Sequence, residues 1–189
     1  NGKTVIFISD DEITDSLKIS EHFKEKTALI ITPTKLSFYM KNKNFLENLK
    51  CCSLIMSGAE TFSSSLYEDL RKYTSAEIYN GYGPTETTCG SLYSKVFDMN
   101  NITIGKPIAN TQIYILDKYR KPLPIGIAGE LCISGDGVGK GYLNRPELTA
   151  EKFIPNPFYD EKINPTAGKI MYCTGDLACW REDGEIEYL

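Results

Sequence analysis

The segment "NGYGPTE" at residues 80–86 gathers side chains that suit a nucleotide. The amide of Asn80 can both donate and accept a hydrogen bond, which fits the edge of adenine. The ring of Tyr82 offers a flat face for a base. The hydroxyl of Thr85 can contact a phosphate oxygen, and Glu86 offers a hard oxygen ligand for Mg²⁺. These residue types predict a nucleotide and metal site in this loop.

An alternative interpretation of residues 80–86 is purely structural. Asn-Gly and Gly-Pro pairs mark turns, and a Thr-Glu pair can open a helix. The residues alone leave both interpretations open.

Two further loops could contribute to a ligand site. "SGAE" at residues 57–60 follows an apolar run, and Gly58 and Ala59 expose flat backbone against which a planar base could lie. In "YCTGDLACW" at residues 172–180, Gly175 permits a tight turn that presents Asp176. One carboxylate can accept both hydroxyls of a ribose, although Asp after Gly in a turn is also common without a ligand.

The glycine-rich stretch "SGDGVGKGYLNRP" at residues 134–146 fails as a phosphate-binding loop. Lys140 is followed by Gly141, where that motif requires Ser or Thr. We therefore interpret this stretch as a turn.

The elements that must position these loops change character along the chain. Short apolar runs predict strands at 4–9, 28–32, 53–57 and 76–80, with helical patterns at 14–26, 45–49 and 63–73 between them. This alternation is typical of a parallel α/β sheet, in which ligands bind beyond the carboxyl ends of the strands. Ser63 and its neighbours, and Thr14 or Asp15, are candidate helix caps.

The second half of the chain predicts mostly antiparallel strands. They lie at 111–117, 129–135, 171–180 and 184–189, with one helix at 145–153 and a hairpin at Asp183-Gly184. The predicted fold class is therefore α/β: a partial parallel βαβ subdomain at residues 1–100, followed by a β-barrel-like subdomain at residues 101–189.

Composition excludes several classes of function. A net charge of −4 argues against a nucleic-acid partner or an acidic membrane surface. No apolar run approaches the roughly 20 residues that span a bilayer. The six cysteines form no C-x-x-C pair, which argues against a zinc site, and we expect reduced thiols in a cytoplasmic protein.

Taken together in order and spacing, the motifs resemble those of adenylation domains. "SGAE", "NGYGPTE", "GELCISGDGVGKGYLNRPELTAEKF", "YCTGDLACW" and "DGEIEYL" are similar to core motifs of non-ribosomal peptide synthetases, within the superfamily of adenylate-forming, AMP-binding enzymes. The resemblance covers nearly the whole chain. "GYLNRPELTAEKFIPNPF" favours the peptide-synthetase branch over acyl-CoA synthetases.

The resemblance implies a role for each matching residue. Thr85 and Glu86 would be catalytic, as a phosphate contact and a magnesium ligand, and Asp176 would hold the ribose hydroxyls. The implied nucleotide-binding residues are Gly58, Ala59, Glu60, Asn80, Gly81, Tyr82, Gly83, Thr85, Asp176 and Tyr188. The implied amino-acid pocket would draw on Ile30, Ile55, Ser57, Gly81, Cys89 and Gly90. These pocket residues are small or aliphatic, which favours an uncharged substrate side chain.

The implied reaction has two stages. An amino-acid carboxylate attacks the α-phosphate of ATP with Mg²⁺, giving an aminoacyl adenylate and pyrophosphate. The aminoacyl group then passes to a phosphopantetheine thiol on a peptidyl carrier domain of the parent chain.

The resemblance also implies that this sequence is a fragment of the large N-terminal lobe. The phosphate loop would lie upstream and the C-terminal lid domain downstream, so we expect the isolated fragment to be inactive. Two alternatives remain: a fragment of a stand-alone acyl-CoA or D-alanine–carrier ligase, or a non-catalytic nucleotide-binding or structural piece.

Overall fold

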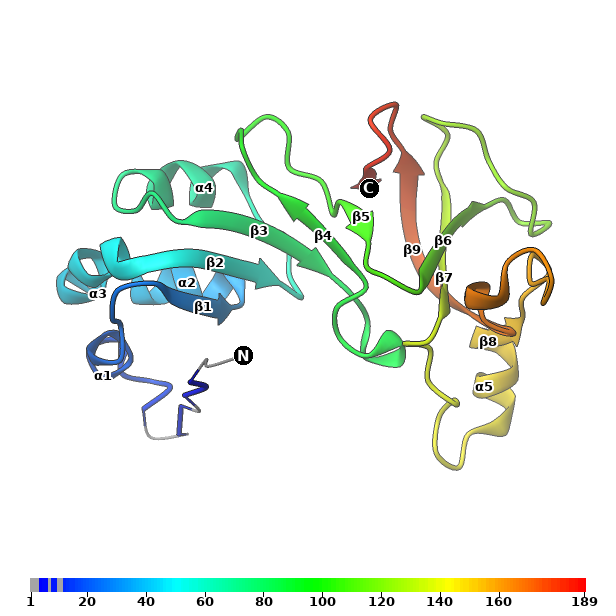
Figure 1. Cartoon of the computed structure of the whole chain (residues 1–189), viewed down its shortest axis with the longest axis horizontal. Coiled ribbons are helices and arrows are strands. Elements are labelled where there is room, and N and C mark those ends of the chain that lie inside the picture. The colour runs from blue at the N-terminus through cyan, green and yellow to red at the C-terminus, as the bar shows by residue number, and fades with distance from the viewer. Residues whose placement is uncertain (1–3, 7, 10–11) are drawn as a thin grey trace. The chain divides into compact units, whose positions relative to one another are not determined.

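The computed structural model describes residues 4–6, 8–9 and 12–189 (Figure 1). Its residues form two compact units. The first comprises residues 1–79 and 95–102, and the second comprises residues 80–94 and 103–189. Strands β3 (Glu77–Tyr82) and β4 (Leu92–Lys95) run through both units.

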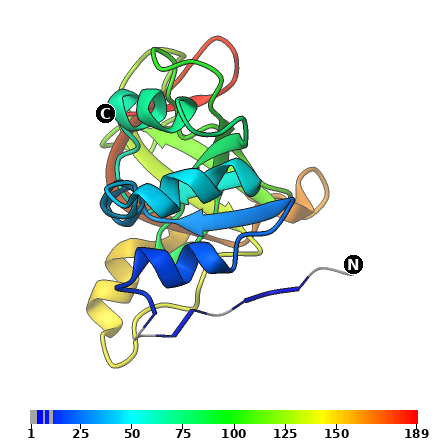
Figure 2. The ribbon, with the colours of Figure 1, turned by 90° about the vertical axis from the view of Figure 1, so that its left-hand side faces the viewer.

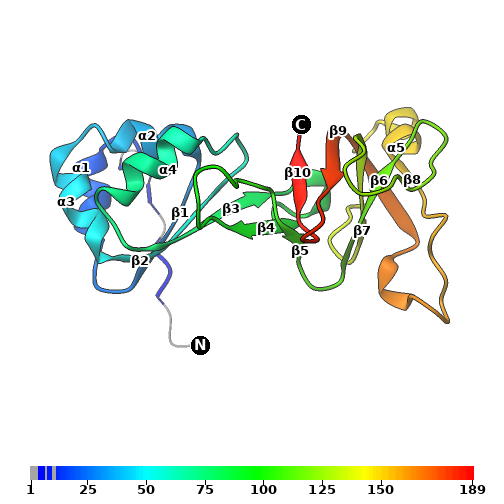
Figure 3. The ribbon, with the colours of Figure 1, turned by 90° about the horizontal axis from the view of Figure 1, so that it is seen from above.

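The first unit contains the predicted parallel α/β pattern. Strand β1 (Thr27–Ile31), the blue arrow in Figure 2, pairs in parallel with β2 (Cys52–Gly58). It is the edge strand of a sheet with the order β1-β2-β3-β4-β5. The helices of this unit are α1 (Ser16–Glu21), α2 (Pro33–Tyr39), α3 (Lys43–Asn48) and α4 (Ser64–Arg71), with a 3₁₀ turn at Leu49–Cys51. Figure 3 shows the helices grouped on one face of the strands.

Local chemistry explains how these helices begin. The Asp15 carboxylate accepts from the backbone N–H of Leu17, and the Ser63 hydroxyl accepts from that of Leu66, so each satisfies an unpaired donor at a helix start. The helices pack a shared core in which Leu36, Phe45 and Ile55 are fully buried.

One local prediction in the first unit is wrong. Residues 4–6 and 8–9 form no strand, and Val5 and Ile6 are exposed; Phe7 lies outside the described residues. An apolar run indicates a tendency to be buried, but a strand also needs a pairing partner. Strand β1 ends at Ile31, and Pro33 occupies the first turn of α2, where its missing N–H costs no helical hydrogen bond.

The second unit is built mainly from an antiparallel sheet of order β10-β9-β7-β6, with β8 also paired to β9. Its strands are β6 (Thr111–Leu116), β7 (Gly129–Gly135), β8 (Phe153–Pro155), β9 (Ile170–Trp180) and β10 (Ile186–Tyr188). The unit also contains β5 (Lys106–Pro107), α5 (Pro146–Lys152) and 3₁₀ turns at Thr85–Thr87 and Pro165–Ala167. Strand β9 is long and curved, and the sheet forms a curled half-barrel (Figure 1).

The antiparallel character of this half and its hairpin are confirmed. Strands β9 and β10 pair antiparallel around Asp183-Gly184, and Gly184 has a φ of +74°, a conformation that glycine adopts without strain. Leu131, Ile133 and Ile186 form the centre of the main core of this unit.

Among the described residues, no helix combines the length and apolar character that crossing a membrane would require.

Candidate functional site

The segment 80–91, which comprises the end of β3 and the loop after it, turns back on itself at Gly83. A Cβ at Gly83 would lie 2.1 Å from the carbonyl oxygen of Cys89, a separation that no side chain tolerates. The backbone N–H of Ser91 donates to the carbonyl of Tyr82 at 2.9 Å, which closes the loop. Thr88 adopts a left-handed conformation with a φ of +64°. The loop is therefore a folded unit with a close backbone approach at its neck.

Tyr82, at the start of this loop, is tied to Asp176 of β9. The Tyr82 hydroxyl donates to Oδ2 of Asp176 at 2.5 Å, and the Tyr188 hydroxyl donates to Oδ1 at 3.4 Å. The two tyrosine rings lie 6.1 Å apart between centroids. Burial and the bond to Asp176 raise the pKa of Tyr82, so its hydroxyl stays protonated and acts as a donor. Asp176 thus accepts one hydroxyl on each carboxylate oxygen.

A bulge in β9 presents Asp176. The β7–β9 register pairs Glu130 with Leu177 and Cys132 with Cys173, so residues 174–176 lie opposite the single residue 131. Gly175 has a φ of +85°, and the Asp176 N–H donates to the Thr174 hydroxyl at 2.9 Å. A bulge changes the direction in which a side chain leaves a sheet. Here it leaves the Asp176 carboxylate half-exposed.

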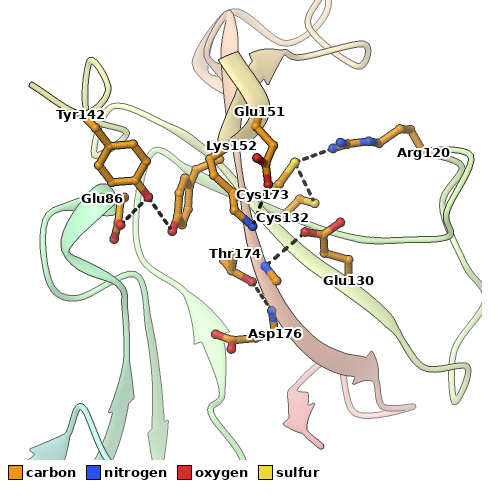
Figure 4. Close-up of polar contacts among 12 residues, drawn as sticks. Glu86, Arg120, Glu130, Cys132, Tyr142, Glu151, Lys152, Cys173, Thr174 and Asp176 are labelled. Carbon is orange, nitrogen blue, oxygen red and sulfur yellow. Dashed lines mark hydrogen bonds and ion pairs between the residues drawn. The ribbon is translucent and has the colours of Figure 1, made fainter. Parts of the chain in front are cut away.

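Glu86, in the 3₁₀ turn that follows the glycine loop, is held by Tyr142. The Tyr142 hydroxyl donates to Oε1 of Glu86 at 2.6 Å and lies 3.4 Å from the Tyr172 hydroxyl (Figure 4). The hydrogen bond from Tyr142 lowers the pKa of Glu86, outweighing the opposing effect of burial. The Glu86 carboxylate is therefore ionised at neutral pH, as an oxygen ligand for a divalent cation must be.

The other predicted residues of the 80–86 loop differ in accessibility. Asn80 is buried, and its Nδ2 donates to the backbone carbonyl of Thr103 at 2.8 Å. Thr85 is exposed, so its hydroxyl is accessible to a ligand. Gly81 and Gly83 are half-buried.

The predicted residues of the 57–60 loop belong to the first unit. Ala59 has a φ of +66°, and the exposed Glu60 carboxylate accepts from the Thr34 N–H at 2.9 Å, a bond that lowers the pKa of Glu60. Gly58 is half-buried. The Ser57 hydroxyl is buried and, among the described residues, has no hydrogen-bond partner.

The predicted pocket residues are also divided between the two units. Ile30 of β1 is 78% exposed, whereas Ile55 of β2 is fully buried in the first core. In the second unit, Cys89 is exposed and Gly90 is half-buried beneath Tyr93, whose hydroxyl lies 2.1 Å from the position of a Cβ at residue 90. Residue 90 must therefore be glycine for the Tyr93 hydroxyl to stay in place.

Three residues near the site could not be predicted from local sequence patterns. Tyr142 and Tyr172 contact the Glu86 side of the site from 56 and 86 residues away, and no local pattern links them to it. Lys152 lies beside the β9 bulge, with its Nζ 3.7 Å from the position that a Cβ on Gly175 would occupy. Its Nζ lies 3.8 Å from a carboxylate oxygen of Glu151, and both side chains are labelled in Figure 4.

Comparisons with known proteins identify the family of the chain. A family model described as "AMP-binding enzyme" matches residues 1–143. The chain is 40% identical over 195 residues to tyrocidine synthase 3 of Brevibacillus parabrevis and 43% identical over 197 residues to bacitracin synthase 3 of Bacillus licheniformis. All of this chain is covered in both alignments, but only 3% of each relative.

Among solved structures, the chain is similar to a four-domain nonribosomal peptide synthetase in its holo form, bound to AMP and glycine. The TM-score is 0.80 at 33% sequence identity, and the match covers 94% of this chain and 13% of that one. The chain therefore spans a small part of the length of the proteins it matches.

Proposed function

Because the chain belongs to the family of AMP-binding enzymes, we propose that it supplies the nucleotide-facing part of an amino-acid-activating adenylation domain. The single observation that carries this proposal is the Asp176 carboxylate, which accepts a hydroxyl on each of its oxygens at the tip of a bulge. A carboxylate with about four acceptor positions can hold the two hydroxyls of a ribose beside, or in place of, those of the two tyrosines.

In this proposal, each part of the nucleotide contacts a different residue of the second unit. Asp176 binds the ribose, the ring of Tyr82 flanks the adenine, and the exposed Thr85 hydroxyl contacts a phosphate. The bond between Tyr82 and Asp176 fixes both side chains before a ligand arrives, which reduces the entropy lost on binding. Asn80 shapes the adenine end through its bond to the Thr103 carbonyl.

The donor set at Glu86 fits a magnesium ion. The carboxylate is ionised and half-buried, and its Oε1 is oriented by Tyr142. Magnesium, when bound, would neutralise charge on the phosphates of ATP. The chain itself offers no nucleophile in this proposal, so its residues act by positioning and by stabilising charge.

In the proposed reaction, the carboxylate of an amino acid attacks the α-phosphorus of ATP and pyrophosphate leaves. The aminoacyl group of the resulting adenylate is then transferred to a phosphopantetheine thiol on a peptidyl carrier domain. In the second unit, the predicted pocket residues Gly81, Cys89 and Gly90 are small and uncharged, which favours an uncharged substrate side chain. The relatives named above are peptide synthases, which favours this parent over a stand-alone ligase.

A binding experiment tests the proposal without requiring turnover by this chain. A non-hydrolysable aminoacyl-adenylate analogue is titrated into the protein by calorimetry, beside Asp176→Ala and the control Glu182→Ala, which removes an exposed carboxylate from the β9–β10 hairpin. We expect Asp176→Ala to weaken binding at least tenfold, or about 1.4 kcal/mol, and the control to leave it unchanged. Equal affinities for all three proteins would contradict the proposal.

A further inference from the structure

A pair of buried thiols lies outside the nucleotide site. Cys132 of β7 and Cys173 of β9 are both less than 3% exposed, and their sulfur atoms are 3.7 Å apart. They are separated by 41 residues in the sequence, and the strand register places them directly opposite each other. All six cysteines of the chain are free thiols.

The register makes this pair suitable for a covalent bond. Residues opposite each other in an antiparallel pair have Cα atoms about 4.5 or 5.5 Å apart, depending on the hydrogen-bonding pattern. Both separations lie within the range of about 4.4–6.8 Å that disulfides occupy. The sulfur atoms need to approach from 3.7 Å to about 2.05 Å, which side-chain rotation can provide.

One thiol of the pair is activated and the other is not. The Cys132 thiol donates to the Cys173 sulfur, and the Arg120 guanidinium donates to the same sulfur (Figure 4). Together they lower the pKa of Cys173 to about 7, although burial and the nearby Glu130 carboxylate act in the opposite direction. The pKa of Cys132 is raised by its role as donor and by burial. A thiolate beside a protonated thiol is the arrangement in which oxidation proceeds to a disulfide.

A metal ion is a weaker explanation for this cluster. Glu130, Cys132 and Cys173 place their ligand atoms within 4.8 Å of one another. However, the cationic Arg120 already contacts the Cys173 sulfur, and a second cation there would be repelled.

We propose that Cys132 and Cys173 form a peroxide-sensitive dithiol that closes reversibly to a disulfide between β7 and β9. The Cys173 thiolate attacks one oxygen of hydrogen peroxide, the O–O bond breaks, and hydroxide leaves and is protonated to water. The sulfur of Cys132 then attacks the sulfenic acid sulfur of Cys173, the S–O bond breaks, and the departing oxygen takes the Cys132 proton as a second water. Two thiols are oxidised by two electrons and one peroxide is reduced to two waters.

A disulfide between Cys132 and Cys173 would lie next to the β9 bulge. Cys173 precedes the β9 bulge that presents Asp176, and Glu130 accepts a hydrogen bond from the Gly175 N–H at 3.1 Å. The disulfide would fasten β7 to β9 immediately before this bulge. The inference does not depend on the proposed nucleotide site.

Peptide mapping tests the proposal on the unmodified sequence. The folded protein is treated with hydrogen peroxide in the presence of a chelator, its free thiols are alkylated after unfolding, and the digest is analysed by mass spectrometry. We expect a Cys132–Cys173 cross-linked peptide that dithiothreitol removes. Cys52 should remain reduced, because burial raises its pKa to about 12. Recovery of both Cys132 and Cys173 as alkylated thiols, at a peroxide dose that oxidises the exposed Cys89, would overturn the proposal.

A matched pair of variants tests whether Arg120 activates the Cys173 thiol. Arg120→Gln removes the guanidinium, and Lys121→Gln removes the adjacent, exposed cation. If the pKa of Cys173 rises by one unit, its thiolate fraction at pH 7 falls about fivefold, and cross-linking should slow by the same factor. Lys121→Gln should react like the wild type. Equal rates in all three proteins would overturn the role of Arg120. If Arg120→Gln fails to fold, the pH dependence of the wild-type cross-linking rate replaces this test. The rate should rise as the pH passes through about 7, and a rate that does not change there would overturn the proposal.

Discussion

The Tyr142 hydroxyl donates a 2.6 Å hydrogen bond to Oε1 of Glu86, which holds the carboxylate that we assign to magnesium. The bond joins two glycine-containing loops that are far apart in the sequence. A backbone hydrogen bond joins the same two loops, from the Gly139 N–H to the Glu86 carbonyl at 2.8 Å. The glycine-rich turn 134–146 therefore holds Glu86, the residue that we propose as the magnesium ligand, by two hydrogen bonds.

Replacing Tyr142 by phenylalanine should destabilise the second unit in a pH-dependent way. The bond lowers the pKa of Glu86, so its contribution is present above the unfolded-state pKa and is lost as the pH falls through the folded-state value. For a half-exposed carboxylate we expect a loss of about 1 kcal/mol at pH 7 and much less at pH 3. Denaturant unfolding at both pH values measures it. Tyr119→Phe, at a 70% exposed position, is the control. A loss that does not change with pH would contradict the assignment.

Tyr82→Phe should cost more stability than Tyr188→Phe. Tyr82 is half-buried with a 2.5 Å bond to Asp176, whereas Tyr188 is 45% exposed with a 3.4 Å bond. Hydrogen bonds to charged groups contribute about 1.5–3 kcal/mol, and exposure reduces this, so we expect about 2 kcal/mol for Tyr82 and under about 0.5 kcal/mol for Tyr188. Urea unfolding of the two variants provides the comparison, and a larger loss for Tyr188→Phe would contradict the assignment of the stronger hydrogen bond to Tyr82.

Gly83→Ala should disrupt the 80–91 loop. The added Cβ would meet the Cys89 carbonyl at 2.1 Å, and a backbone atom cannot move aside as a side-chain end can. We expect a loss of at least about 2 kcal/mol. Gly126→Ala is the control, because its φ is +80° but nothing lies within 4 Å of its Cβ position, so it reports conformational strain alone, about 1 kcal/mol. Equal losses by denaturant unfolding would refute the close approach.

Asn156 should anchor the polar loop 156–169. Its buried Nδ2 donates to the carbonyls of Ala167 and Gly168 and to the Ser134 hydroxyl, at 3.0–3.2 Å. Asn156→Ala removes these bonds. The Ala167 carbonyl keeps the Ser134 hydroxyl as a donor, but the Gly168 carbonyl loses its Nδ2 donor, so we expect a loss of about 2 kcal/mol and faster proteolysis within the loop. Limited proteolysis with mass spectrometry locates the cleavage. Asn164→Ala, outside the buried network, is the comparison, and equal cleavage rates would contradict the anchoring role.

Much of the fold could be predicted from local chemistry. The hairpin at Asp183-Gly184 follows from turn residues, and the start of α1 at Asp15 follows from a capping side chain. The apolar run at residues 4–9 predicted a strand, but the described residues 4–6 and 8–9 form none, because hydrophobic side chains do not by themselves provide a neighbouring strand to pair with. Helix α2 was missed because Pro33 can end one element and begin another.

The site could be predicted only in part. The residue types in the 80–86 loop and at Asp176 indicated nucleotide chemistry, but local patterns cannot show contacts between distant residues. Tyr82 and Asp176 are 94 residues apart, and Cys132 and Cys173 meet only through the β7–β9 register. Spacing rules for cysteine consider neighbours in sequence, so they could not reveal this pair.

Ribose recognition by Asp176 is the central claim, and a double-mutant cycle by calorimetry tests it most directly. AMP and 2′,3′-dideoxy-AMP are each titrated into the wild type and into Asp176→Ala. We predict that the wild type binds AMP at least tenfold more tightly than the dideoxy nucleotide, and that the variant binds both equally, because the lost hydroxyls and the lost carboxylate are the same interaction. A wild type that does not distinguish the two nucleotides, or a variant that keeps the full preference for AMP, would contradict the account.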